Sequence, residues 1–332
     1  MPELGQSEMP GEDAALVEGL LAGNRRALAK AITLVESTRP DHRLRAQALL
    51  GVVLPHSGRS LRLGISGVPG VGKSTFIEAL GMFLIERGHR IAVLAVDPSS
   101  TVHGGSILGD KTRMELLSQR EEAFIRPTPS SGSLGGVAEH TREALLLCEA
   151  AGNDIIIVET VGVGQSETAV AGMTDCFVLL QLPNAGDDLQ AIKKGIMELA
   201  DLVVFNKADI DPAAAQLAAA QMRSALSMLH PASVNWQPPV LTLSATRKDG
   251  LAGFWQVIEE FRTTLAASGE FDARRRHQAL AWMWQLVDSG LREDFRRHPA
   301  VRDTLATTAA AVEAGSITPT AAARHLLDLA AQ

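Results

Sequence analysis

A glycine-rich loop between an apolar run and an amphipathic run restricts the fold of this chain more than any other feature. The loop lies in GISGVPGVGKST, residues 64–75, where two glycines five positions apart are followed by Lys73 and Ser74. The residues before it, 61–66, resemble a strand, and the stretch TFIEALGMFLIERG that continues it has the apolar spacing of a helix. Strand, glycine loop and helix in this order are typical of a phosphate-binding loop.

Each residue type in this loop has a physical role in holding phosphate. Glycines let backbone N–H groups turn inward around an anion, and the helix N-terminus adds partial positive charge. We expect Lys73 to bridge the β- and γ-phosphates and the Ser74 hydroxyl to bind Mg²⁺. The expected phosphate-binding residues are Gly67, Val68, Pro69, Gly70, Val71, Gly72, Lys73, Ser74 and Thr75.

Strand-sized apolar runs alternate with helix-length segments through the middle of the chain. They lie at residues 61–66, 90–97, 154–160, 175–182, 201–207 and 239–244. Continuous apolar strands separated by helices predict an α/β fold, a P-loop NTPase with a doubly wound, mostly parallel sheet. Apolar residues recur at helical spacing both before and after this region, which predicts N-terminal and C-terminal helical extensions. The sequence STRPDHR marks a break between two helices of the N-terminal extension. The expected domains are 1–58 (N-terminal helices), 59–268 (P-loop NTPase domain) and 269–332 (C-terminal helical dimerisation arm).

A second motif predicts which base the site accepts. Asn206, Lys207 and Asp209 form the pattern NKxD at the end of an apolar run. A carboxylate at Asp209 can accept two hydrogen bonds from guanine, whereas adenine offers no such pair of donors. We expect Lys207 to lie along the base, Asn206 to join this loop to the phosphate loop, and the N–H of Ala245, after Ser244, to meet guanine O6. Selectivity for guanine of about 10⁴ is plausible for such a pocket.

Three acids are candidates for the metal shell. Asp97 ends the run after the loop helix, Asp110 lies in the next connection, and Glu159 follows a buried run in ETVG, where GTP switches usually have Asp. Either aspartate alone could be a helix cap. Gly162 would offer its N–H to the γ-phosphate and move when that group leaves. The expected catalytic residues are Lys73, Glu159 and Gly162, and the expected metal ligands are Ser74, Asp97, Asp110 and Glu159.

Composition restricts the function classes further. The chain has 332 residues, is 46% apolar, and carries a net charge of −7, which argues against broad nucleic-acid binding. No run approaches the roughly 20 apolar residues of a membrane span, and the first residues have no targeting pattern, so we expect a cytoplasmic protein. Cys148 and Cys176 have no metal-ligand spacing and are expected to be buried.

The segment after residue 268 carries two further patterns. Leu280, Trp284, Val287, Leu291 and Phe295 recur at helical spacing and form one apolar stripe. The stripe either packs on the α/β domain or forms a dimerisation arm, and the pattern does not choose between them. A late basic group is interpreted as a solvated helix face or an interface; its members are Arg274, Arg275, Arg276, Arg292, Arg296 and Arg297.

Taken in order, GVPGVGKST, AVDPSS, GDKTRM, SSGSLGGVA, ETVGVGQSE, NKAD and SA resemble the motifs of the MeaB/ArgK family of GTPases. The resemblance covers about residues 12–300 and implies a homodimer that uses GTP, GDP and Mg²⁺. It also implies a G-protein chaperone that gates adenosylcobalamin loading and protects methylmalonyl-CoA mutase or a related acyl-CoA mutase. The implied switch candidates are Asp187, Asp188 and Lys193. No arginine lies where the sequence would place a catalytic finger, but Arg113 is a candidate supplied in cis.

Three other functions share some of these features. A nickel-delivery maturation GTPase would need a Cys or His site near the switch segments, where His103 is the only nearby histidine. A kinase or ATPase linked to amino-acid transport would need ATP, which Asp209 disfavours. A nucleotide binder that does not hydrolyse GTP is the third.

Overall fold

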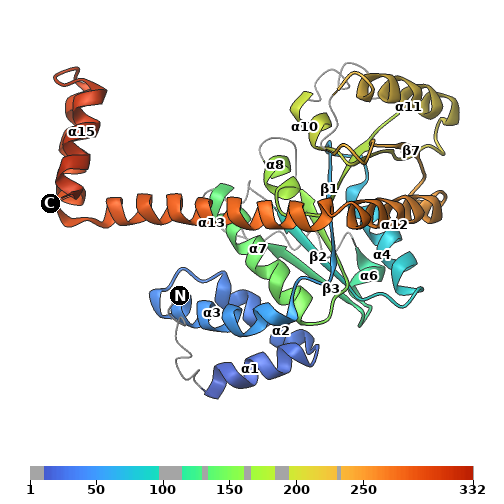
Figure 1. Cartoon of the computed structure of the whole chain (residues 1–332), viewed down its shortest axis with the longest axis horizontal. Coiled ribbons are helices and arrows are strands. Elements are labelled where there is room, and N and C mark those ends of the chain that lie inside the picture. Colours follow the sequence, from blue (N-terminus) through green and yellow to red (C-terminus); the bar gives the residue numbers. More distant parts are fainter. Residues whose placement is uncertain are drawn as a thin grey trace. The chain divides into compact units, whose positions relative to one another are not determined.

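The computed structural model of the chain describes residues 11–96, 114–128, 134–160, 166–183, 194–229 and 233–331. It divides into two compact units, Met1–Arg276 and His277–Gln332. The first unit contains the sheet and its covering helices (Figure 1). Among the described residues, no helix is both long enough and apolar enough to cross a bilayer.

The first unit is built on a seven-stranded sheet in which all paired strands are parallel. The strand order is β3-β2-β4-β1-β5-β6-β7. The strands are β1 (Leu61–Gly67), β2 (Ile91–Val96), β3 (Ala123–Thr128), β4 (Ile155–Thr160), β5 (Cys176–Gln181), β6 (Leu202–Phe205) and β7 (Val240–Thr242). The α/β prediction and its six strands are confirmed.

Strand β3 was not predicted from the sequence. Its residues AFIRPT include Arg126 and Pro127, which interrupt the apolar run. Pro127 has no N–H to donate, and proline in a sheet is confined to edge strands and bulges. β3 is at the edge and pairs only with β2, so the sheet accepts a sequence that would not suit a central strand.

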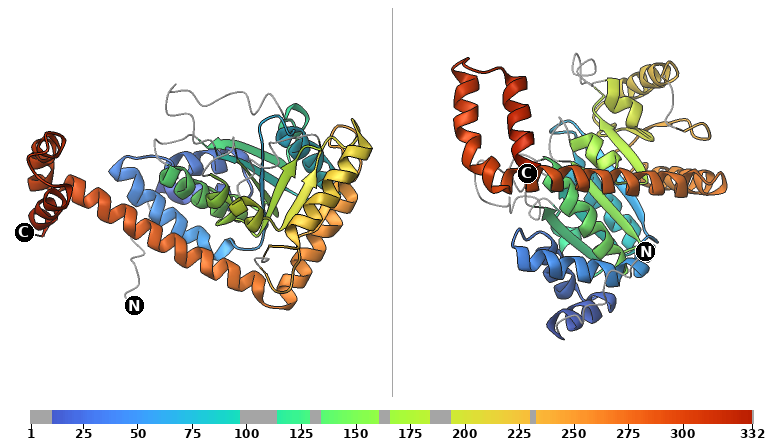
Figure 2. Two further views of the ribbon diagram at one scale, coloured as in Figure 1. Left: turned by 90° about the horizontal axis from the view of Figure 1, so that it is seen from above. Right: turned by 60° about the vertical axis from the view of Figure 1, so that its left-hand side comes forward.

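Helices cover both faces of the sheet (Figure 2). Alternate side chains of each strand point to opposite faces. Leu63, Ile65 and Ile157 therefore belong to one buried layer, and Leu94 and Ile156 to the other. The first layer lies under α4 (Lys73–Ile85), α6 (Glu115–Ser118) and α12 (Leu251–Ala267). The second lies under α7 (Leu134–Ala150), α8 (Ser166–Ala171), α10 (Lys194–Leu199) and α11 (Pro212–Leu226).

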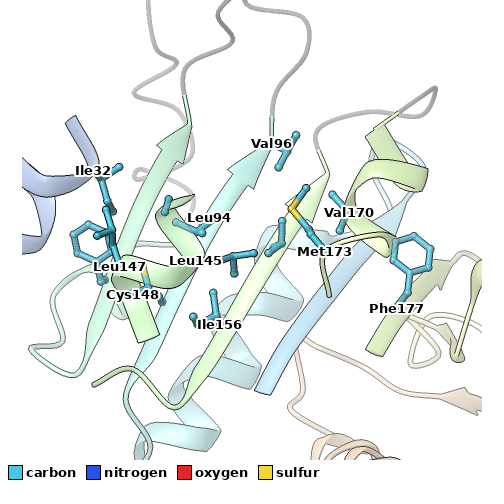
Figure 3. Close-up of a cluster of buried hydrophobic side chains, with 14 of the residues drawn as sticks. Ile32, Leu94, Val96, Leu145, Leu147, Cys148, Ile156, Val170, Met173 and Phe177 are labelled. Carbon is cyan, nitrogen blue, oxygen red and sulfur yellow. The ribbon is translucent and has the colours of Figure 1, made fainter. Parts of the chain in front are cut away.

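Figure 3 shows the second layer, where strand residues such as Ile156 and Phe177 lie near Leu145 of α7 and Val170 of α8. Cys148 is part of this layer and Cys176 of the other. Both cysteines are buried as expected. Burial raises the pKa of both thiols, so neither presents a thiolate to a metal.

From residue 11, where the described part of the chain begins, three helices precede the sheet and lie beside α7 in the first unit (Figure 1). They are α1 (Gly11–Leu21), α2 (Arg25–Val35) and α3 (Pro40–Val53), followed by the short 3₁₀ helix η1 (Leu54–His56). The break before Pro40 is confirmed, but a second break was missed at Gly23 and Asn24. There Gly23 adopts a positive φ of 74°, and the Asn24 side chain caps α2 by accepting from the N–H groups of Arg26 and Ala27.

The chain ends in helices, as predicted: α13 (Glu270–Arg297), α14 (Pro299–Glu313) and α15 (Pro319–Ala330). In the second unit α14 and α15 pack against each other as a pair (Figure 2). Helix α13 buries none of its residues. Leu280, Trp284 and Leu291 on its apolar stripe are exposed by 58%, 61% and 64%.

The interpretation of the late arginines was wrong for two of them. Arg274, near the start of α13, makes a bidentate pair with Asp201 at 2.8 and 2.9 Å. Arg275 pairs with Asp175 at 2.7 and 2.6 Å and also donates to the carbonyls of Gly58 and Ser60. Because Asp175 and Asp201 lie directly before β5 and β6 and are buried, these pairs join the first turns of α13 to the amino ends of two strands.

Candidate nucleotide site

The phosphate loop connects the end of β1 to the first turn of α4, and two of its glycines cannot be replaced without a clash. A Cβ on Gly67 would lie 2.5 Å from the carbonyl oxygen of Leu180 on β5. Gly72 has a φ of 91°, and a Cβ there would lie 2.9 Å from the Nδ2 of Asn206. Glycine thus allows the loop to run close to β5 and to the loop that begins at Asn206.

Lys73 lies over the loop that contains it. Its Nζ donates to the carbonyl oxygen of Gly67 at 2.7 Å and reaches that of Val68 at 3.4 Å. These are neutral acceptors, and an arriving phosphate oxygen would offer the ammonium a charged one. The amine is therefore already at the mouth of the loop, while the neighbouring Thr75 is exposed.

The register of β4 against β1 brings Glu159 close to the phosphate loop. Glu159 shares the parity of Ile155 and Ile157, so it points to the face covered by α4, and it lies opposite Ile65 of β1. The side chain is buried, with 4% exposure, and its Oε1 accepts from the Ser74 hydroxyl at 3.4 Å. A hydroxyl and a carboxylate oxygen side by side form the start of an oxygen ligand set of the kind Mg²⁺ prefers.

On the same edge, the hydroxyl of Thr160 donates to that of Ser66 at 2.9 Å. Both side chains are buried. This contact joins the last residue of β4 to β1 just before the phosphate loop. It was not anticipated from the sequence, because the pairing of β4 with β1 is set by the tertiary fold.

Asn206 joins the two nucleotide loops to each other. Its Nδ2 donates to the carbonyl of Val71 in the phosphate loop at 2.9 Å, which confirms the expected connection. Its Oδ1 accepts from the N–H of Ala245 at 3.1 Å. This second contact differs from the expected role of Ala245, because guanine O6 would have to share that hydrogen. Lys207 has a φ of 60° and donates from Nζ to the carbonyl of Gly70 at 2.8 Å.

Asp209 lies beside the loop that follows β7. A hydrogen bond from Ser244 is the main cause that lowers the pKa of Asp209, and the charge of Arg247 acts in the same direction. The Nε of Arg247 is 3.5 Å from the Oδ2 of Asp209. Arg247 was not predicted from the sequence, where its only signal is a basic residue shortly after the SA pair.

Predicted residues of the phosphate, metal and base sites come together at the carboxyl edge of the sheet: Lys73, Ser74, Glu159, Asn206, Lys207, Asp209, Ser244 and Ala245. This is the edge where open α/β sheets bind ligands, and β1 lies at the switch point between the two halves of the strand order. The remaining metal and switch candidates lie outside the described residues: Asp97, Asp110, Arg113, Gly162, Asp187, Asp188 and Lys193.

The parallel sheet, the phosphate loop and the NKxD loop joined to it by Asn206 are those of a P-loop GTPase. A family model described as "Methylmalonyl Co-A mutase-associated GTPase MeaB" matches residues 28–300. The chain belongs to this family.

Individual relatives agree with this assignment. A probable GTPase of Mycobacterium bovis is 56% identical over 316 residues, covering 95% of this chain and 94% of the relative. The mouse protein named methylmalonic aciduria type A homolog, mitochondrial, is 49% identical, covering 94% of this chain and 78% of that protein. A solved structure titled LAO/AO transport system kinase has a TM-score of 0.77 at 40% identity, covering 97% of this chain and 99% of that one.

Proposed function

We propose that this GTPase is a G-protein chaperone that gates adenosylcobalamin loading and protects methylmalonyl-CoA mutase or a related acyl-CoA mutase. The family match over residues 28–300 supports the mutase as partner. The observation that supports a working hydrolytic site is the meeting of Ser74 and Glu159 beside the phosphate loop.

In the proposed site the nucleotide phosphates lie on residues 67–75 and the guanine on Asn206, Lys207, Asp209, Ser244 and Ala245. Lys73 would exchange its backbone carbonyl partners for phosphate oxygens, because a charged acceptor forms the stronger hydrogen bond. Ser74 and Glu159 would hold Mg²⁺, which when bound offsets phosphate charge. Outside the described residues, Asp97 and Asp110 would complete the metal shell and Gly162 would sense the γ-phosphate.

The first test is coupling between the nucleotide and the mutase. We expect slow GTP turnover alone, about 10⁻⁴ to 10⁻² s⁻¹, and faster turnover on addition of methylmalonyl-CoA mutase. Nucleotide affinity should also shift, about 5- to 150-fold, since a coupling of 1–3 kcal/mol is typical of such gates. Phosphate release and fluorescent GDP titration measure the two quantities. If the mutase changes neither the rate of GTP turnover nor the nucleotide affinity, the proposed function is refuted.

Glu159→Gln is the matched control for this test. Glutamine keeps the size of the side chain and an oxygen acceptor for Ser74, but it removes the charge near the metal. We expect this variant to bind GDP and the mutase, to keep its preference for guanine, and to lose about 10²-fold in turnover. A loss of guanine preference would mean that Glu159 has another role.

The apolar stripe of α13 supports a homodimer. Leu280, Trp284 and Leu291 are each more than half exposed, and an apolar helix face of this kind typically pairs with another protein surface. Light scattering is expected to give a dimer for the unaltered chain and a monomer for Trp284→Asp. Leu44→Asp, at a residue 71% exposed on α3, is the control and should remain dimeric. A monomeric unaltered chain at micromolar concentration would contradict the proposal.

The alternatives receive less support. Nickel delivery would need accessible cysteine or histidine ligands, but both cysteines are buried, and His103 lies outside the described residues. A kinase role linked to amino-acid transport would need ATP, whereas the site carries Asp209 beside Ser244. A Lys73→Ala comparison of turnover would distinguish a binder that does not hydrolyse GTP.

A further inference from the structure

The loop after β7 places Arg247 next to the proposed guanine-reading carboxylate. Ser244 and Asp249 exchange backbone hydrogen bonds, each N–H donating to the other's carbonyl at 3.1 Å. This closes a short loop over residues 245–248, in which the N–H of Lys248 donates to Ala245 and Lys248 has a φ of 57°. The geometry fixes the backbone from which the Arg247 side chain extends.

Arg247 reaches Asp209 by two routes. Its backbone N–H donates to the Ser244 hydroxyl at 3.2 Å, and that hydroxyl in turn hydrogen-bonds to Asp209. Its guanidinium reaches the carboxylate directly, with Nε 3.5 Å from Oδ2. The Arg247 side chain is 69% exposed and that of Asp209 is 20% exposed, so the arginine lies on the solvent side of the carboxylate.

The carboxylate can accept guanine without losing the hydrogen bonds it already has. An ionised aspartate offers about four lone-pair positions over its two oxygens. Guanine would use two, one for N1–H and one for the exocyclic amine, while Ser244 and the backbone N–H of Asp209 itself use the others. Arg247, with Nε 3.5 Å from Oδ2, acts through its charge. The arginine therefore need not compete with the base for a lone pair.

We propose that Arg247 is a positioning residue for base recognition, which keeps the Asp209 carboxylate oriented for guanine. This inference rests on the proposed guanine site and adds a residue to it. A bound base covers Asp209 and removes water from it. A neighbouring cation then offsets the lost hydration of the carboxylate, and it does so without touching the nucleotide.

The test is a double-mutant cycle on the full chain, with fluorescent GDP as the probe. Arg247→Met removes the charge and keeps much of the apolar stem. We expect the GDP dissociation constant to rise about two- to fivefold at 50 mM salt, the range of an exposed ion pair. The effect should nearly vanish at 1 M salt, where the Debye screening length is only about 3 Å. Arg247→Lys should recover part of the affinity, and Lys248→Met, the adjacent exposed cation, should have little effect.

The cycle is completed in the Asp209→Asn background with fluorescent XDP as the probe. Asparagine carries no charge, so Arg247→Met should then leave affinity unchanged. Three results would overturn the proposal: unchanged GDP affinity in Arg247→Met, tighter GDP binding, or the same loss in both backgrounds, which would place Arg247 on another part of the nucleotide. Failure of the guanine site itself is distinguishable, because Asp209→Asn alone would then leave GDP affinity intact.

Discussion

Asp209→Asn is expected to change the base preference of this GTPase from guanine to xanthine and to lower its affinity for GDP by about three orders of magnitude. In the proposed site the Asp209 carboxylate accepts from guanine N1–H and the exocyclic amine, and the substitution replaces it with an amide, which accepts with one atom and donates with the other. Xanthine carries a carbonyl where guanine carries the amine, so the amide N–H gains an acceptor. Competition of GDP, XDP and ADP against a fluorescent nucleotide measures the change in preference.

Asp249→Asn is the matched control for this change. Asp249 is an exposed carboxylate on the same loop, and it contacts Ser244 through backbone atoms. The Asp249→Asn variant should keep its preference for guanine. In both variants the contacts of Asn206 with Val71 and Ala245 should hold the two loops in place. Equal GDP affinity in Asp209→Asn and the unaltered chain would mean that the base binds elsewhere.

Arg275→Ala is expected to lower the free energy of unfolding by about 3–5 kcal/mol, the cost of leaving one charge of a buried pair uncompensated. Asp175 is 1% exposed and accepts two hydrogen bonds from Arg275. Without them the Asp175 carboxylate keeps the hydrogen bond from the backbone N–H of Arg62. Urea unfolding followed by circular dichroism measures the loss.

Two comparisons make this result interpretable. Arg39→Ala removes an exposed partner of Asp41 and should leave the unfolding midpoint nearly unchanged, because exposed pairs contribute little. Arg274→Ala should also destabilise the chain strongly, since Asp201 is 5% exposed. If Arg275→Ala unfolds no more easily than Arg39→Ala, the pair with Asp175 does not hold α13 to the strands.

The phosphate loop could be predicted from the sequence because its signals are local. A strand, a glycine loop with Lys73 and Ser74, and a helix follow one another along the chain, and each is readable within about ten residues. The same holds for the NKxD pattern, where Asn206 makes the expected contact with the phosphate loop. Buried central strands carry continuous apolar runs, and all six such runs proved to be strands.

Features that depend on distant partners were missed or misread. The edge strand β3 contains Arg126 and Pro127, and only its single neighbour β2 makes it a strand. Arg274 and Arg275 looked like solvated helix residues, because nothing nearby in the sequence indicates that Asp201 and Asp175 lie against them. Arg247 was missed for the same reason, because Arg247 lies in the loop after β7 and its partner Asp209 lies in the loop after β6.

The sequence by itself determined the class of protein: a parallel sheet with a phosphate loop and a guanine-type motif, each encoded by neighbouring residues. Only the tertiary structure decided which side chains meet. The parity and register of β4 against β1 bring Glu159 to Ser74, and the closed loop after β7 brings Arg247 to Asp209. Period and spacing are properties of a single segment, whereas charge pairing depends on which segments the folded sheet places side by side.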